Sequence, residues 1–113
     1  MFNLKVYEIT GERAILDSDG DIVYQKLLNA FSNNEHVELD FSGVTTILSI
    51  FTNSAIGQLY KHYFLNDHLK ITHMSPEDML SLKRVNERAK QFYTSPEDTS
   101  QFLKGEIFDE WNN

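Results

Sequence analysis

The sequence contains no cysteine and only five glycines. Without cysteine the chain has no thiol nucleophile, no disulfide and no cysteine-ligated zinc, which is compatible with a reducing cytosol. The glycines are scattered at positions 11, 20, 43, 57 and 105, and they match neither the dinucleotide-binding nor the P-loop spacing. A nucleotide-dependent enzyme is therefore not expected.

Long apolar runs and positive charge are also scarce. No apolar run approaches the roughly 20 residues needed to cross a bilayer, and Met1 to Lys5 lack the basic-then-apolar order of a signal peptide. We therefore expect a cytoplasmic protein that does not bind membranes. Acidic residues outnumber basic ones by 17 to 10, giving a net charge of -7. Because such a chain repels phosphate backbones, nucleic-acid binding is not expected.

The chain does have the size and composition of one folded domain. It is 113 residues long, with 41% hydrophobic and 24% charged residues. That length is enough to bury a single core without disulfides or metal, and it is too short for two independent cores.

Hydrophobic spacing alternates along the chain between the strand period of two and the helix period of about 3.6. The pattern predicts strands at residues 2–9, 14–16, 37–41 and 69–74, and helices at 17–31, 49–63, 76–92 and 96–111. Alternating strands and helices in one small domain favour parallel strand neighbours joined by crossovers. The predicted fold is an α/β sandwich, with a small mixed or largely parallel sheet and helices packed on it.

A tetrapeptide, Ser-Pro-Glu-Asp, occurs at 75–78 and again at 95–98. Each copy offers an N-cap hydroxyl, a proline at the first helical position and two carboxylates in the first turn, so each predicts a helix start. We expect residues 1–94 to form the domain and 95–113 to form a helical extension that packs on it. The side chains expected to make that contact are Phe102, Leu103, Phe108 and Trp111.

The acidic and imidazole side chains do not form a known metal motif. The acidic turn at 17–21 has its glycine and its twelfth residue in the wrong places for an EF-hand loop. It is interpreted as the acidic cap of a helix, and a weak Mg²⁺ or Ca²⁺ site there stays open. The four histidines, His36, His62, His68 and His73, lack metal-ligand spacing. No metal or cofactor is expected.

A hydrolytic triad can be assembled on paper from Ser49, His73 and Asp40, but no Gly-x-Ser-x-Gly elbow surrounds the serine. No catalytic residue is therefore predicted, and the chain is not expected to be an enzyme. A hydrolase is the least favoured alternative.

The segment 40–54 mixes hydroxyl and apolar residues where a strand gives way to a helix. Three interpretations stay open. Ser49 or Thr52 caps the helix, with Asn53 and Ser54 satisfying other first-turn amides. Alternatively, the turn is a phosphorylatable switch, or it binds a partner without being phosphorylated.

The stretch VELDFSGVTTILSIFTNSAIGQLY resembles the signature of the STAS-like domains, a small cytoplasmic branch related to anti-sigma-factor antagonists. In this family a strand ending in Asp-Phe-Ser-Gly-Val leads through a serine-containing turn into a helix. The residues that fall on the motif are Asp40, Phe41, Gly43, Val44, Phe51, Asn53, Gly57 and Leu59. A weaker resemblance extends over about residues 3 to 93.

The resemblance implies a non-enzymatic protein-interaction or regulatory module in bacterial signalling. In the antagonists, a GHKL-type partner kinase phosphorylates a serine or threonine in this turn, and Ser49 is the nearest position here. The chain departs from that pattern at Leu48, Ile50 and Asp19, where relatives usually have Asp, a small hydroxyl residue and Arg. The candidate partner-binding or phosphorylation residues are Ser49, Thr52, Asn53 and Ser54.

The expected partner is a GHKL-type kinase or ATPase, or another regulatory protein. The predicted surface is the turn at 44–54 with the exposed side of the helix that follows. Some STAS domains sense small ligands or nucleotides, which is the alternative function. The oligomeric state stays open.

Overall fold

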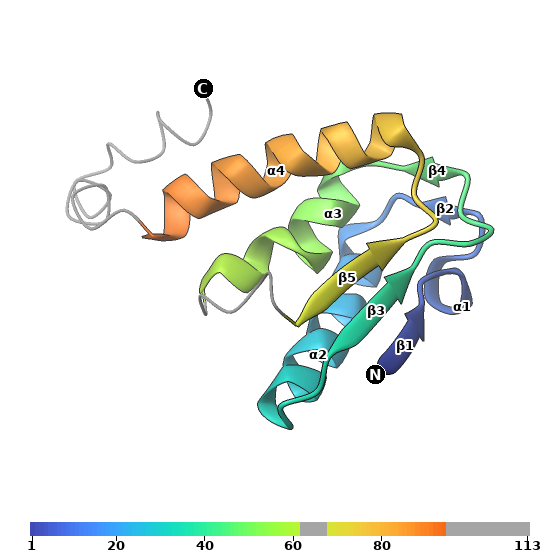
Figure 1. The fold of residues 1–113 in the computed structure, drawn as a ribbon. Helices are drawn as coiled ribbons and strands as arrows, with labels where there is room; N and C mark the ends of the chain where they lie inside the picture. Colours follow the sequence, from blue (N-terminus) through green and yellow to red (C-terminus); the bar gives the residue numbers. More distant parts are fainter. Residues whose placement is uncertain (62–67, 95–113) are drawn as a thin grey trace.

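The computed structural model describes residues 1–61 and 68–94 (Figure 1). Strands and helices alternate along these residues, so the predicted α/β class is confirmed. The elements are β1 (Phe2–Lys5), α1 (Tyr7–Thr10), β2 (Arg13–Ala14), α2 (Asp17–Ser32), β3 (Val37–Asp40), β4 (Thr46–Ile47), α3 (Ser49–Ala55), the 3-10 helix η1 (Gly57–Lys61), β5 (Leu69–Thr72) and α4 (Pro76–Thr94).

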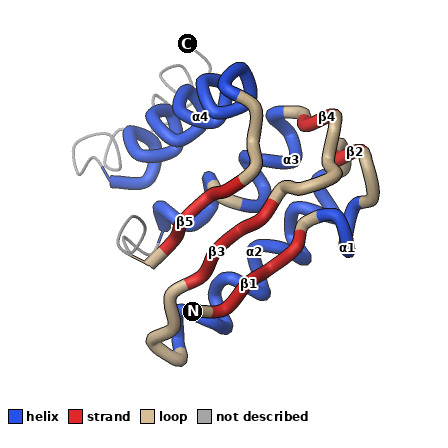
Figure 2. The backbone as a smooth tube through the Cα atoms, turned by 45° about the vertical axis from the view of Figure 1, so that its right-hand side comes forward, coloured by secondary structure: helices blue, strands red, loops and turns tan. Residues whose placement is uncertain are grey.

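The main sheet has three strands in the order β1-β3-β5, and both pairings are parallel. Phe2 lies opposite Val37, which in turn lies opposite Leu69. Helices α2 and α3 lie behind one face of this sheet, and α4 runs past its β5 side (Figures 1 and 2). A second, two-stranded parallel sheet pairs β2 with β4. The predicted largely parallel sheet with helices packed on it is confirmed.

The core lies between the sheet and the helices that cover its inner face. Alternate residues of β3 and the residue after it point inward and are buried, namely Val37, Leu39 and Phe41. Phe41 meets Phe51 of α3 edge to face, with ring centroids 6.5 Å apart. The remaining large buried apolar side chains of the core include Leu4, Val6, Val23, Leu27, Ile56, Leu59 and Leu82.

The helix starts differ in how they are capped. Helix α4 begins as predicted, because the Asp78 N–H donates to Ser75 Oγ at 3.1 Å and the Ser75 hydroxyl donates to Asp78 Oδ2 at 2.9 Å. The acidic cap predicted for α2 is wrong: its N-cap residue is Leu16, which makes no side-chain cap hydrogen bond. Asp17 and Asp19 lie instead in the first turn, where carboxylates complement the helix dipole.

Other differences from the predicted elements are local. Residues 7–10 form the short helix α1 instead of continuing the first strand, and β4 was not predicted. Helix α3 ends at Ala55 and continues as η1. The second Ser-Pro-Glu-Asp segment and the predicted extension at 95–113 lie outside the described residues. Among the helices described in 1–61 and 68–94, none is both long enough and apolar enough to cross a membrane.

Candidate functional site

The turn expected to bind a partner is held beside the start of α2. The small β2–β4 ladder places Arg13 opposite Thr46 and Ala14 opposite Ile47, and the Leu48 N–H donates to the Ala14 carbonyl oxygen at 3.0 Å. Because each strand leads directly into a helix, α2 and α3 begin side by side. These two helices also pack against each other along their length.

The predicted capping role of the hydroxyls in this turn is wrong. Helix α3 begins at Ser49, and its N-cap residue Leu48 makes no side-chain cap hydrogen bond. The Thr52 hydroxyl donates backward to the Ser49 carbonyl oxygen at 3.2 Å instead of accepting a first-turn N–H. Ser49 is exposed, and within the described residues its hydroxyl has no hydrogen-bond partner. Ser49 is therefore accessible without carrying the structural role that a cap would give it.

Two of the four predicted surface residues are buried. Thr52 is 4% exposed and Ser54 is 9% exposed. The Ser54 hydroxyl lies 2.6 Å from the Asp21 carboxylate and 2.9 Å from the Asp17 carbonyl oxygen, so it joins α3 to the first turn of α2. Asn53 is partly buried, with its Oδ1 turned toward Gly57. Thr52 and Ser54 pack within the domain and are not available to a partner.

Large apolar side chains surround Ser49 on the exposed side of the turn. Leu48 is 47% exposed and Ile50 is 53% exposed. Leu16, the residue before α2, is 52% exposed and lies two residues after the end of β2, the strand that pairs with β4. We call Leu16, Leu48, Ser49 and Ile50 the helix-start patch. Neighbouring exposed apolar side chains of this kind are typical of protein-interaction sites.

The other motif residues stabilise the fold. Asp40 ends β3 and accepts hydrogen bonds at Oδ1 from the Ser42 N–H at 2.8 Å and from the Ser42 hydroxyl at 2.7 Å. Gly43 follows with a φ of +85°, a left-handed conformation that glycine adopts without strain. Phe41 and Phe51 belong to the core. These residues give the turn its shape.

Gly57 allows close packing where α3 gives way to η1. A Cβ atom at this position would lie 2.7 Å from Asn53 Oδ1 and 3.6 Å from Ala89 Cβ of α4. The close approach is therefore to the Asn53 side chain, whereas the distance to Ala89 of α4 is that of an ordinary van der Waals contact.

A cluster of polar side chains lies at the carboxyl ends of β3 and β5, and the sequence had indicated two of its members, Asp40 and His73. His73 follows β5, and its Nδ1 lies 2.9 Å from Asp40 Oδ1. The Ser42 hydroxyl and N–H, followed by the His73 imidazole, hold the pKa of Asp40 below its usual value, although burial acts in the opposite direction. Because an ionised carboxylate only accepts hydrogen bonds, His73 Nδ1 is the donor.

The hydrolytic triad assembled from the sequence does not form in the described residues. Asp40 and His73 do meet, but the hydroxyl on the shared carboxylate is that of Ser42, while Ser49 lies at the start of α3. A triad requires the imidazole to bridge the carboxylate and the hydroxyl, whereas here Asp40 bridges the other two. The carboxylate of Glu38, which was not predicted as a site residue, also joins this cluster. Its position two residues before Asp40 on a strand was the available signal.

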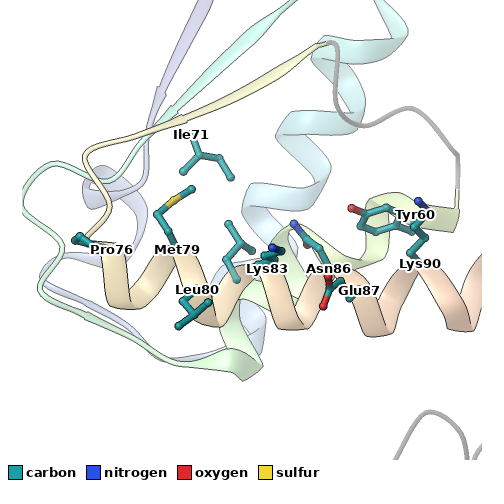
Figure 3. Close-up of a pocket in the computed structure, with 10 residues that line it drawn as sticks. Tyr60, Ile71, Pro76, Met79, Leu80, Lys83, Asn86, Glu87 and Lys90 are labelled. Atoms are coloured by element: carbon teal, nitrogen blue, oxygen red, sulfur yellow. The ribbon is translucent and has the colours of Figure 1, made fainter.

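A groove lies along α4, between that helix, β5 and η1 (Figure 3). It has a volume of about 620 Å³. Its lining residues are Tyr60, Ile71, Pro76, Met79, Leu80, Leu82, Lys83, Asn86, Glu87 and Lys90. Within the described residues, the Oδ1 atom of Asn86 is buried without a hydrogen-bond partner. The groove therefore combines apolar side chains with three charged ones, Lys83, Glu87 and Lys90.

Comparison with protein families identifies the family to which this chain is similar. The model of a family described as "STAS-like domain of unknown function (DUF4325)" matches residues 19–79, which is just over half of the chain. The matched region runs from the first turn of α2 into the first turn of α4, and it includes the Asp-Phe-Ser-Gly turn and the helix-start residues Leu48 to Ile50. Comparisons with curated proteins and with solved structures find no match.

Proposed function

Because this chain belongs to the family of STAS-like domains, we propose that it acts as a non-enzymatic, cytoplasmic protein-interaction module that binds a regulatory protein through the helix-start patch. The observation that carries the proposal is the exposure of Leu48 and Ile50 on either side of Ser49, whose hydroxyl has no hydrogen-bond partner among residues 1–61 and 68–94. The paired starts of α2 and α3 give this surface a rigid base, which reduces the entropy lost on binding.

Charge added at Ser49 offers a way to switch such an interaction. A phosphate carries about -1.5 to -2 charges, and at Ser49 it would lie between two apolar side chains that the partner must cover. A partner that packs against a neutral, apolar turn loses affinity when it has to desolvate that charge. A GHKL-type kinase or ATPase, the partner implied by the family resemblance, would supply both the phosphate and the binding surface.

The change Ile50→Arg tests the interaction surface. Because Ile50 is 53% exposed, we expect the variant to fold normally and to lose affinity for the recovered partner by about tenfold or more. Affinity purification from native lysate identifies the partner, and calorimetry with the purified pair measures the affinity. Phe2→Arg is the matched control, since Phe2 is 41% exposed and is the first residue of β1, outside the helix-start patch. Equal affinity for Ile50→Arg and the native chain would contradict the proposal.

The switch is tested by comparing Ser49→Asp with Ser49→Asn, two side chains of the same shape that differ in charge. We expect the Asp variant to bind the partner about tenfold more weakly than the Asn variant, with melting temperatures that agree closely. The same calorimetric titration measures both. If the two variants bind equally, Ser49 belongs to the contact surface without switching it.

A second candidate function is the sensing of a small ligand, and the groove along α4 favours it. Its lining of apolar side chains with Lys83, Glu87 and Lys90 suits a small molecule that is mostly apolar and carries a polar or charged end. Native mass spectrometry of the purified chain distinguishes the two functions, because a sensor retains a bound small molecule whereas a simple interaction module does not.

A further inference from the structure

The outer face of the main sheet carries two carboxylates. Side chains alternate along a strand, so Glu38 and Asp40 of β3 project away from the core that Val37 and Leu39 enter. Helices α2 and α3 lie behind the opposite face (Figures 1 and 2). The carboxylates therefore face the side of the sheet opposite α2 and α3, where Asp40 is 8% exposed.

Within the described residues, no lysine or arginine pairs with either carboxylate. Strand register places Lys70 beside Glu38 and Lys5 beside Asp40, yet neither lysine forms an ion pair with them. The described ion pair is that of Asp40 with His73. Two neighbouring carboxylates thus have one imidazole beside them and, within the described residues, no paired lysine or arginine, which leaves negative charge for a cation to neutralise.

The chain directs the imidazole of His73 onto these carboxylates. His73 leaves β5 with a φ of +61°, an uncommon conformation for a residue with a side chain, and its ring meets Asp40. Thr72 holds the carboxylate of Glu38 in place, since the Thr72 hydroxyl donates to Glu38 Oε2 at 2.8 Å. One potential ligand atom from each of Glu38, Asp40 and His73 lies within 4.8 Å of the other two.

We propose that Glu38, Asp40 and His73 form a binding site for a divalent transition-metal ion such as Zn²⁺. Imidazole nitrogen and carboxylate oxygen are ligands that zinc accepts, and three protein ligands leave a fourth position for water or another ligand. Zinc bonds of about 2.0–2.2 Å place ligand atoms about 3.4 Å apart in a tetrahedral site, so side-chain rotation closes the set without moving the strands. Magnesium, which prefers oxygen ligands, is expected to bind more weakly.

Metal binding changes the hydrogen bonding of the cluster in a defined way. If the ion binds His73 at Nδ1, it displaces the proton that this atom donates to Asp40, and the bound neutral imidazole then carries its single proton on Nε2. Ser42 and Thr72 then act as outer partners that orient the two carboxylates. The site lies at the carboxyl ends of parallel strands, where α/β sheets commonly bind ligands.

Calorimetric titration of the native chain with Zn²⁺ tests the site, with His73→Gly as the decisive variant. Glycine removes the imidazole and suits the positive φ at this position, so the variant should fold. We expect His73→Gly and Glu38→Gln each to lower Zn²⁺ affinity at least about tenfold, and Thr72→Val to lower it less.

The control is His36→Ala, because His36 and His68 form a stacked imidazole pair with centroids 4.4 Å apart, which is the competing candidate for zinc binding. Unchanged zinc affinity in His36→Ala, together with a loss in His73→Gly, supports the proposed site. No zinc binding by the native chain, equal affinity in His73→Gly, or loss of binding in His36→Ala would each overturn it.

Discussion

Replacing Gly20 with alanine should destabilise the domain by about 2 kcal/mol and lower its melting temperature by roughly 10 °C. A Cβ atom at this position would lie 2.7 Å from Ser54 Cβ and 2.8 Å from the Phe51 carbonyl oxygen of α3. The Phe51 carbonyl belongs to the backbone and cannot rotate away from the added Cβ atom as a side chain could. Helix α2 must therefore shift away from α3. Thermal unfolding followed by circular dichroism measures the effect.

This expectation opposes the usual effect of the substitution. Alanine in the interior of an exposed helix stabilises it by about 0.5–1 kcal/mol relative to glycine. Gly57→Ala is the matched control, since its Cβ would meet the movable end of Asn53 at 2.7 Å and Ala89 Cβ at 3.6 Å. We expect Gly57→Ala to change stability by less than about 1 kcal/mol. If Gly20→Ala is as stable as the native chain, the close contact of α2 with α3 is not as described.

Thr52→Arg should destabilise the domain by about 3 kcal/mol or more, enough to leave much of the protein unfolded at moderate temperature. Thr52 is 4% exposed, and its hydroxyl donates to the Ser49 carbonyl oxygen. The longer, charged arginine has no space and no described carboxylate within the core to pair with. Chemical denaturation in urea gives the difference in unfolding free energy.

Ile50→Arg provides the comparison for this result, because it places the same side chain two residues earlier on the same helix. Ile50 is 53% exposed, so the cost in stability should be within about 0.5 kcal/mol. Similar destabilisation by both changes would mean that the two sides of α3 are not distinguished as the structure describes. Partner binding can be attributed to α3 only with Ile50→Arg, since Thr52→Arg alters the fold itself.

The sequence predicted the elements whose signals are local. Alternating apolar residues identified β3, helical spacing identified α2, and the Ser75-Pro76 cap identified the start of α4. The family motif around Asp40 and Gly43 also predicted the turn correctly. Both residue types favour a turn by themselves, because glycine adopts the left-handed conformation easily and the short aspartate side chain accepts a hydrogen bond from the backbone N–H two residues later.

The sequence could not predict features that depend on contacts between distant segments. Which face of α3 is buried depends on how α3 packs against α2. The hydrogen bonds of Ser54 with Asp17 and Asp21 of α2 place the Ser54 hydroxyl inside the domain. The β2–β4 ladder is too short to leave a periodic pattern. His73 and Glu38 come together only because β3 and β5 are neighbours in the sheet. Because Glu38 and His73 are far apart in the chain, their spacing in the sequence did not indicate a metal motif.

The parallel pairing of the strands also determines how the chain must fold. No two described strands are joined by a hairpin, since β1 pairs with β3 across α2, and β3 pairs with β5 across α3 and η1. Each pairing therefore requires a long loop to close before any hydrogen bond of the sheet can form, which slows folding relative to a helical bundle of the same size. On a ribosome, β1 would remain unpaired until β3 had emerged, and β5 would be the last strand to join. The central strand β3 is thus the one on which assembly of the sheet depends, because both of its edges receive strands that arrive at different times.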